Sequence, residues 1–95
     1  MVVKVWIPPQ LRSVTDGNSS VPAKGDTVHE VLLDLKRQFP AFTERVLDEN
    51  GKVRPYLNIY LNDEDIRFLQ GESTPVKDGD EFSIILEIGG GQATP

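Results

Sequence analysis

Hydrophobic and polar residues alternate along three stretches of the chain, at residues 2–7, 56–61 and 82–88. A period of two is typical of a β-strand that buries one face and leaves the other in contact with solvent. Pro8 and Pro9 follow the first stretch and predict its end, because proline has no backbone N–H to donate to a sheet. The pattern therefore predicts three strands.

A helical period replaces this alternation after residue 26. Thr27 and Glu30 have the spacing of a capping box, with Asp26 as the alternative cap. Pro40 predicts the end of the helix. One apolar stripe runs along the predicted helix at Val28, Val31, Leu32, Leu35 and Phe39.

Shorter elements fill the rest of the chain. Turn residues at 15–20 precede a second predicted strand at 20–24, and residues 42–47 predict a short helix. A turn at 62–65 is followed by a brief predicted edge strand at 66–68. Strands on both sides of one main helix favour an α+β fold in which the helix packs on one face of a sheet.

Length and composition narrow the class of protein. The 95 residues fit a single domain, which we expect at residues 1–88, with a flexible glycine tail at residues 89–95. The net charge of −5 argues against nucleic acid or an anionic membrane as a partner. The absence of cysteine excludes a disulfide scaffold and fits a cytoplasmic protein. No stretch approaches the roughly 18 apolar residues that span a bilayer.

Candidate catalytic groups are few. His29 is the only histidine and lies off the apolar stripe of the helix, where it is more typical of a surface side chain than of a catalytic one. Asp63, Glu64 and Asp65 form an acidic run without the ligand spacing or the glycine of a calcium loop, so we expect no metal site. The sequence predicts that the protein is not an enzyme.

Three glycines, Gly89, Gly90 and Gly91, follow the last predicted strand. Glycine has no Cβ, so its backbone can enter a channel too narrow for other residues. The same run also fits a frayed chain end. Taken alone, the glycines leave both interpretations open.

Large side chains are also predicted on the solvent side of the sheet. If the alternating aliphatic residues face the helix, then Trp6, Tyr60 and Ile85 face away from it. A cluster of such side chains is typical of a docking surface. Whether these three cluster depends on the order of the strands, which the alternation does not give.

Several segments are shared with one known family. They are the run Leu-Asn-Ile-Tyr-Leu-Asn-Asp-Glu-Asp-Ile-Arg-Phe at residues 57–68, the turn at residues 77–80, Ile7 with Pro8, and the glycine pair after the last strand. In these features the chain resembles the ubiquitin-like sulfur carriers, which include the small subunit of molybdopterin synthase and the carrier of thiazole synthesis. The resemblance is strongest to the actinobacterial carriers of cysteine synthesis, and it extends to Gly91.

The resemblance implies a β-grasp fold, a mixed sheet of four to five strands packed on one main helix. The first and last strands would lie side by side at its centre and the third main strand beside the last. That order would make Trp6, Tyr60 and Ile85 neighbours, and we expect this patch to dock a partner.

The resemblance also implies a mechanism in which the terminal glycine carries sulfur as a thiocarboxylate. A partner related to the ubiquitin-activating enzymes would adenylate the glycine carboxylate with ATP and magnesium, and a sulfur donor would then displace AMP. A biosynthetic enzyme would accept the sulfur. The carrier itself would be a monomer that binds no cofactor stably and needs no catalytic residue.

The chain departs from the family pattern because Gln92, Ala93, Thr94 and Pro95 follow the glycines. We expect a protease to remove these residues and expose Gly91, with cleavage after Gly90 as the alternative. Cysteine is the expected end product, and another sulfur metabolite or the molybdenum cofactor is the alternative. Two other function classes stay open: a ubiquitin-like protein modifier, and an interaction module whose glycines have no role.

Overall fold

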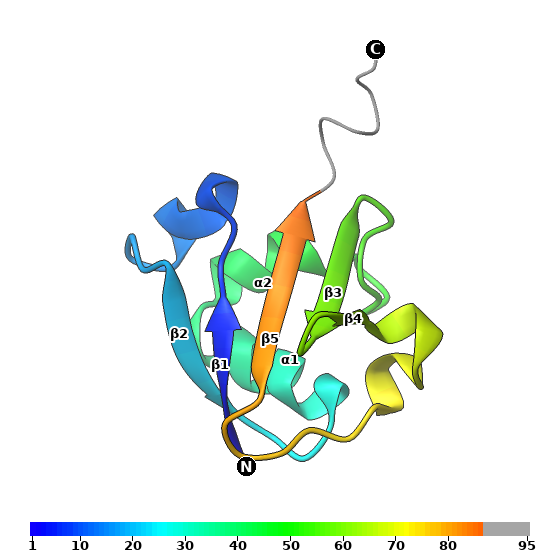
Figure 1. Cartoon of the computed structure of the whole chain (residues 1–95). Coiled ribbons are helices and arrows are strands. Elements are labelled where there is room, and N and C mark those ends of the chain that lie inside the picture. The colour runs from blue at the N-terminus through cyan, green and yellow to red at the C-terminus, as the bar shows by residue number, and fades with distance from the viewer. Residues whose placement is uncertain (87–95) are drawn as a thin grey trace.

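The computed structural model describes residues 1–86, which form one sheet with two α-helices packed against it (Figure 1). Three short 3-10 helices lie in the connections, at Pro9–Val14, Ile66–Phe68 and Gly71–Ser73. The strands and α-helices are β1 (Val2–Trp6), β2 (Ser20–Lys24), α1 (Val28–Gln38), α2 (Pro40–Val46), β3 (Leu57–Leu61), β4 (Glu64–Asp65) and β5 (Glu81–Leu86).

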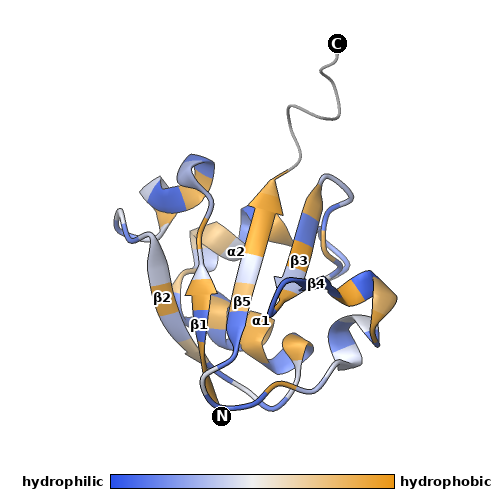
Figure 2. Cartoon of the chain, in the orientation of Figure 1, coloured by the Kyte–Doolittle hydropathy of each residue, from blue (hydrophilic) through white to orange (hydrophobic). Residues whose placement is uncertain are grey.

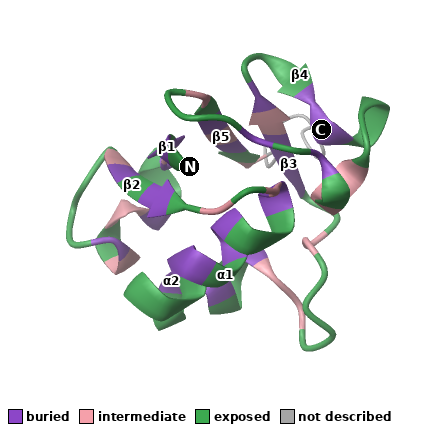
Figure 3. Cartoon of the chain, turned by 90° about the horizontal axis from the view of Figure 1, so that it is seen from below, coloured by how far each residue is buried: buried purple, intermediate pink, exposed green. Residues whose placement is uncertain are grey.

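The strand order across the sheet is β2-β1-β5-β3-β4. The central strands β1 and β5 run parallel, and every other neighbouring pair is antiparallel. Both α-helices cover the same face of the sheet, so the other face is open (Figures 1 and 3). This is the arrangement expected of a β-grasp fold, and it confirms the predicted α+β class.

The start of α1 follows from the predicted capping box. Thr27 is the cap, because its hydroxyl accepts a hydrogen bond from the Glu30 N–H at 3.2 Å. The Glu30 carboxylate reaches back to the Asp26 N–H at 2.8 Å. The helix ends at Gln38, and Pro40 then begins α2 at a position where a missing N–H costs little.

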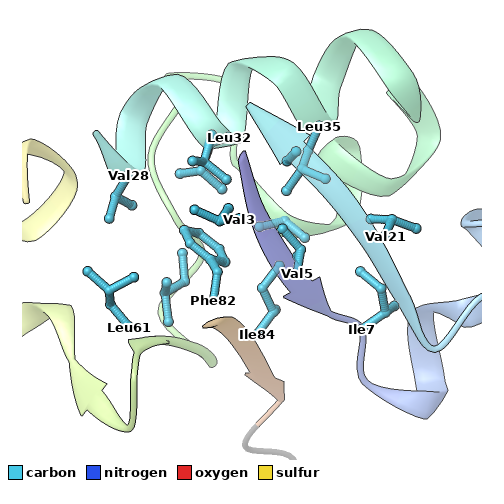
Figure 4. Packing of buried hydrophobic residues seen from close by; sticks show 14 of the residues in the cluster. Val3, Val5, Ile7, Val21, Val28, Leu32, Leu35, Leu61, Phe82 and Ile84 are labelled. Atoms are coloured by element: carbon cyan, nitrogen blue, oxygen red, sulfur yellow. The ribbon is translucent and has the colours of Figure 1, made fainter. Parts of the chain in front are cut away.

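The core lies between α1 and the covered face of the sheet (Figure 4). Leu32 and Leu35 of α1 are fully buried, as are Val5 of β1, and Phe82 and Ile84 of β5. Every second residue of the central strands enters this core, which confirms the alternation predicted for them. Figure 3 shows the same division on α1, where the side facing the sheet is buried and the opposite side is exposed.

The predicted edge strand at residues 66–68 is wrong. Asn62 and Asp63 adopt positive φ angles of 52° and 74°, a turn that pairs Glu64 and Asp65 directly with the end of β3 as strand β4. The residues predicted as a turn therefore contain the edge strand. Ile66–Phe68 is a 3-10 helix, because the Asp65 carboxylate caps it by accepting from the Arg67 N–H at 2.9 Å.

One further difference concerns the connection after β1, and one part of the prediction is not covered by the described residues. The segment after Pro8 was not predicted as an element, yet it forms the 3-10 helix Pro9–Val14 and buries Leu11. Strand β5 is described to Leu86, and the last two residues of the predicted strand lie outside the described part of the chain.

Candidate functional site

The predicted docking side chains lie on the face of the sheet that the helices leave open. Ser83 of β5 is paired with Trp6 of β1 on one side and with Tyr60 of β3 on the other. Ile85 follows on the same face of β5, opposite Asn58. Trp6, Tyr60 and Ile85 therefore surround one position at the centre of the sheet. We call these three residues the outer-face patch; their proximity is as predicted, and their role remains a prediction.

The side chains of the outer-face patch differ in exposure. Ile85 is 44% exposed, whereas Trp6 and Tyr60 are half-buried. The indole of Trp6 is held in place by two neighbours: its Nε1–H donates to the Glu81 carboxylate at 3.1 Å, and Lys4 Nζ lies 4.3 Å from the ring centroid. The tryptophan is thus ordered before any partner binds, which lowers the entropy cost of using it in an interface.

The patch lies where the chain leaves the sheet toward the glycines. Leu86 is paired with Leu57, and the adjoining groove of about 360 Å³ is lined by Trp6, Pro8, Arg12 and Leu86, among others. In Figure 2 the C-terminal half of β5 is coloured as hydrophobic at this end of the sheet. A partner on the outer-face patch would therefore be in reach of the segment after Leu86.

The predicted reactive terminus lies outside the described residues. This applies to Gly89, Gly90 and Gly91, and to the four residues that follow them, Gln92 to Pro95. The structure consequently positions the base of the tail, at Leu86, and the surface beside it.

The remaining candidate groups are occupied by contacts within the fold. His29 Nδ1 lies 3.1 Å from the Glu72 carboxylate on the protein surface. The Arg67 side chain lowers the pKa of the buried Asp65 carboxyl through hydrogen bonds, the shortest of which is 2.6 Å.

Within residues 1–86 no three side chains from His, Asp and Glu come together as a metal site. In the same range no helix is long and apolar enough to cross a membrane.

Sequence reasoning missed one feature of this end of the sheet. Asn58 lies on the open face, where the alternation predicts exposure, yet it is only 3% exposed. Its Oδ1 is buried without a hydrogen-bond partner in the described structure. Neither the residue type nor its spacing signals this burial, which depends on the chain around β3.

An open-faced β-grasp sheet whose central strand leads to paired glycines defines a ubiquitin-like protein. The chain belongs to the ThiS family, which matches residues 5–91, so the matched region ends at Gly91. It is similar to the sulfur carrier protein CysO of Mycobacterium tuberculosis, with 43% identity covering 96% of this chain and 100% of the relative.

Solved structures agree with this assignment. The BexX/CysO complex of Amycolatopsis orientalis contains a chain with 41% identity and a TM-score of 0.84, covering 90% of this chain and 96% of that one. The small archaeal modifier protein 1 of Methanosarcina acetivorans has 32% identity and a TM-score of 0.80, covering 92% and 93%. The β-grasp prediction is confirmed, and the protein is a small ubiquitin-like carrier rather than an enzyme.

Proposed function

We propose that this protein carries sulfur as a thiocarboxylate on Gly91 and delivers it to a biosynthetic enzyme. The observation that carries the proposal is the full-length similarity to CysO, named a sulfur carrier, together with a family match that runs through Gly91. The cysteine-free sequence fits this chemistry, because the reactive group is the end of the chain itself. The reaction needs no catalytic side chain in the carrier.

The proposed reaction has two steps at one carbonyl carbon. The Gly91 carboxylate attacks the α-phosphate of ATP on an activating enzyme, which releases pyrophosphate and leaves an acyl-adenylate. A sulfide equivalent from a donor then forms a C–S bond as AMP departs. ATP and magnesium belong to the partner, so the carrier holds no cofactor of its own.

The glycines would serve this reaction by their lack of side chains. A fully extended chain spans about 3.3–3.6 Å per residue, so residues 89–91 would reach about 10 Å. Without a Cβ, such a segment can enter an active site that excludes other residues. This reach is counted from Ile88, two residues after Leu86, where the described part of β5 ends.

The outer-face patch is the proposed docking surface for the activating enzyme and for the sulfur acceptor. Tryptophan and tyrosine are frequent hot-spot residues of protein interfaces, and Ile85 adds an exposed apolar side chain between them. The similar CysO of Amycolatopsis orientalis was solved in complex with BexX. Complex formation by this chain is part of the proposal.

Processing is also part of the proposal. Residues 92–95 follow Gly91, and an amide bond at that position leaves no carboxylate to adenylate. A protease that cuts after Gly91 would generate the active form, and cleavage after Gly90 is the alternative. Cysteine is the proposed end product, by analogy with CysO, and the cytoplasm is the proposed compartment.

A second candidate function is protein modification. The similarity to an archaeal modifier protein favours it, because a modifier and a sulfur carrier need the same activated glycine. The two functions differ in the nucleophile that attacks the adenylate, a sulfur donor or the amine of a lysine. Covalent conjugates of higher mass in a cell extract would indicate the modifier.

Reconstitution tests the proposed function. Two forms, one ending at Gly91 and one continuing to Pro95, are incubated with a purified activating enzyme related to the ubiquitin-activating enzymes, ATP, magnesium and sulfide, and their intact masses are measured. We expect one oxygen to be replaced by sulfur in the form ending at Gly91 and no change in the longer form. Modification of neither form, or of both equally, contradicts the proposal.

A further inference from the structure

The two edges of the sheet differ in how far their backbone groups are already covered or hydrogen-bonded. At the β2 edge, Pro22 has no N–H, and its carbonyl accepts from Gln38 Nε2 at 2.9 Å. Two residues further along the strand, the Lys24 N–H is satisfied by the Asp34 carboxylate at 3.0 Å. Side chains of α1 thus occupy the groups with which another strand could pair, a common protection of exposed edges.

The β3 edge is covered along only part of its length. Strand β4 pairs with Tyr60 and Leu61 alone, so residues 57–59 have no strand beside them on the side opposite β5 within the described structure. At the start of this stretch the Leu57 N–H already donates to the Arg54 carbonyl at 3.0 Å, which leaves Asn58 and Ile59 as the part without such a turn contact. A cavity of about 290 Å³ lies along this uncovered part. Its walls come from β3, from residues 52–55, and from the 3-10 segment that includes Ile66 and Gly71.

Two polar atoms that belong to residues lining this cavity are buried without a partner. They are Nε of Arg54, a donor, and Oδ1 of Asn58, an acceptor, and they are the only two such side-chain atoms within residues 1–86. A buried polar group without a hydrogen bond is costly, so its presence calls for a missing partner. A peptide group has both an acceptor for the arginine and a donor for the asparagine.

The charges around the cavity favour an acidic ligand. Among the described lining residues, Glu72 is the one acid and lies 3.1 Å from His29 Nδ1, whereas Lys52, Arg54 and Arg67 are basic and Arg67 is paired with Asp65. Lys52 and Arg54 form no ion pair with another described residue, although their charges help to lower the pKa of Asp48, after the larger effect of its hydrogen bond from the Lys52 N–H. The lining is therefore locally positive in a chain whose net charge is −5.

An apolar surface adjoins the same edge. Phe68 is 85% exposed and Leu69 is 37% exposed, directly after Ile66 and Arg67 of the cavity wall. A bound segment would cover part of this surface, and the burial of apolar area would add to its affinity.

We propose that the uncovered β3 edge binds an extended, acidic peptide segment of a partner protein, which adds a strand beside residues 57–59. The segment's backbone would accept from Arg54 Nε–H and donate to Asn58 Oδ1, and its carboxylates would face Lys52 and Arg54. This mode is strand addition at a sheet edge. The site uses none of the three residues of the outer-face patch, although Asn58 is paired with Ile85 of that patch, and the proposal does not depend on the sulfur chemistry.

Peptide titration of the full chain, followed by amide NMR, tests the proposal. The probe is a capped five-residue peptide of alternating valine and glutamate, and the control peptide has lysine in place of glutamate. We expect the acidic peptide to shift the amides of Leu57, Asn58 and Ile59 saturably, and the basic peptide to bind more weakly. Free glutamate at equal concentration should leave these amides unchanged.

Single substitutions distinguish a role of Asn58 and Lys52 in peptide binding from a purely structural role. Asn58→Leu removes the buried acceptor at similar volume, so we expect about tenfold weaker peptide binding with an unfolding temperature that is unchanged or higher. Lys52→Glu should also weaken binding, whereas Lys77→Glu, an exposed charge reversal at the turn before β5, should not. Lys52→Glu keeps the test informative if Asn58→Leu does not fold.

Three results overturn the proposal. The first is the absence of shifts at residues 57–59, which would leave a cavity filled by water alone. The second is equal binding by the wild type and both edge variants. The third is the same set of shifts with free glutamate, which would assign the cavity to a small amino acid instead of a peptide strand.

Discussion

The two faces of the central strands differ in burial and in proposed role, although their residues alternate along the same backbone. Val5, Phe82 and Ile84 point toward the helices and are fully buried, whereas Trp6 and Ile85, their direct neighbours, point to the open face. A shift of one residue in register would exchange the two sets. The comparison indicates that one face supplies the stability of the fold, which leaves the other free for the proposed docking surface.

The largest expected effect is on the covered face. Phe82→Ala removes a fully buried ring and should lower the free energy of unfolding by about 3–5 kcal/mol. Ile85→Ala, three residues along the same strand, should change it by only about 0.5 kcal/mol, because the side chain is 44% exposed on the open face. Urea unfolding measures both, and similar losses for the two variants contradict the division between the faces.

The next effect concerns the connection that places α1 on the covered face. A Cβ at Gly25 would lie 2.7 Å from the Val31 backbone nitrogen, so Gly25→Ala forces the helix start away from the sheet. We expect a loss of about 1–3 kcal/mol in the same unfolding experiment, the usual cost of overpacking. If this variant and the wild type have the same urea unfolding curve, the contact is relieved without loss of stability, which contradicts the prediction.

A smaller effect is expected when the open face is changed. Trp6→Ala and Tyr60→Ala should each weaken binding to the activating enzyme by about tenfold or more, as for hot-spot residues. Stability should change little in comparison with Phe82→Ala. Calorimetric titration with the purified enzyme measures the affinity.

The matched control for these variants is Leu33→Ala. Leu33 is 50% exposed on α1, which packs on the opposite side of the sheet. Its removal should leave the affinity unchanged. Equal weakening by Leu33→Ala, or no weakening by the two patch variants, would assign docking to another surface.

The smallest effect is pH-dependent and concerns the edge beside the open face. Arg67 lowers the folded-state pKa of Asp65, so the pair stabilises the fold above the ordinary pKa of an aspartate. This contribution is lost as the pH falls through the lowered pKa. Asp65→Asn should therefore lose less stability between about pH 5 and pH 2 than the wild type does. Parallel acid dependence of the two proteins contradicts this role.

The sequence predicts the parts of the fold that depend on local chemistry. The capping box at Thr27 and Glu30 and the alternation in β1 and β5 are confirmed, because both follow from residue type and spacing, whereas in β3 the burial of Asn58 breaks the alternation. The position of β4 was missed because positive φ angles at Asn62 and Asp63 tighten the turn. An Asn-Asp pair signals such a turn less strongly than glycine does.

The candidate site likewise combines features that the sequence predicts with features that it does not. The orientation of Trp6, Tyr60 and Ile85 follows from the alternation, but their proximity required the strand order, which the resemblance implied and the register confirms. The burial of Asn58 could not be predicted from a period of two. Residues 52–55, 66–67 and 71–72 border the same cavity as Asn58, and the alternation within β3 carries no information about where these neighbouring segments lie.

The intact mass of the protein purified from its native host tests the central claim most directly. Our account predicts a chain that ends at Gly91 with one oxygen replaced by sulfur, which would establish the carried group and the processing site together. A chain that continues to Pro95 and stays unmodified after incubation with ATP and host extract would contradict it.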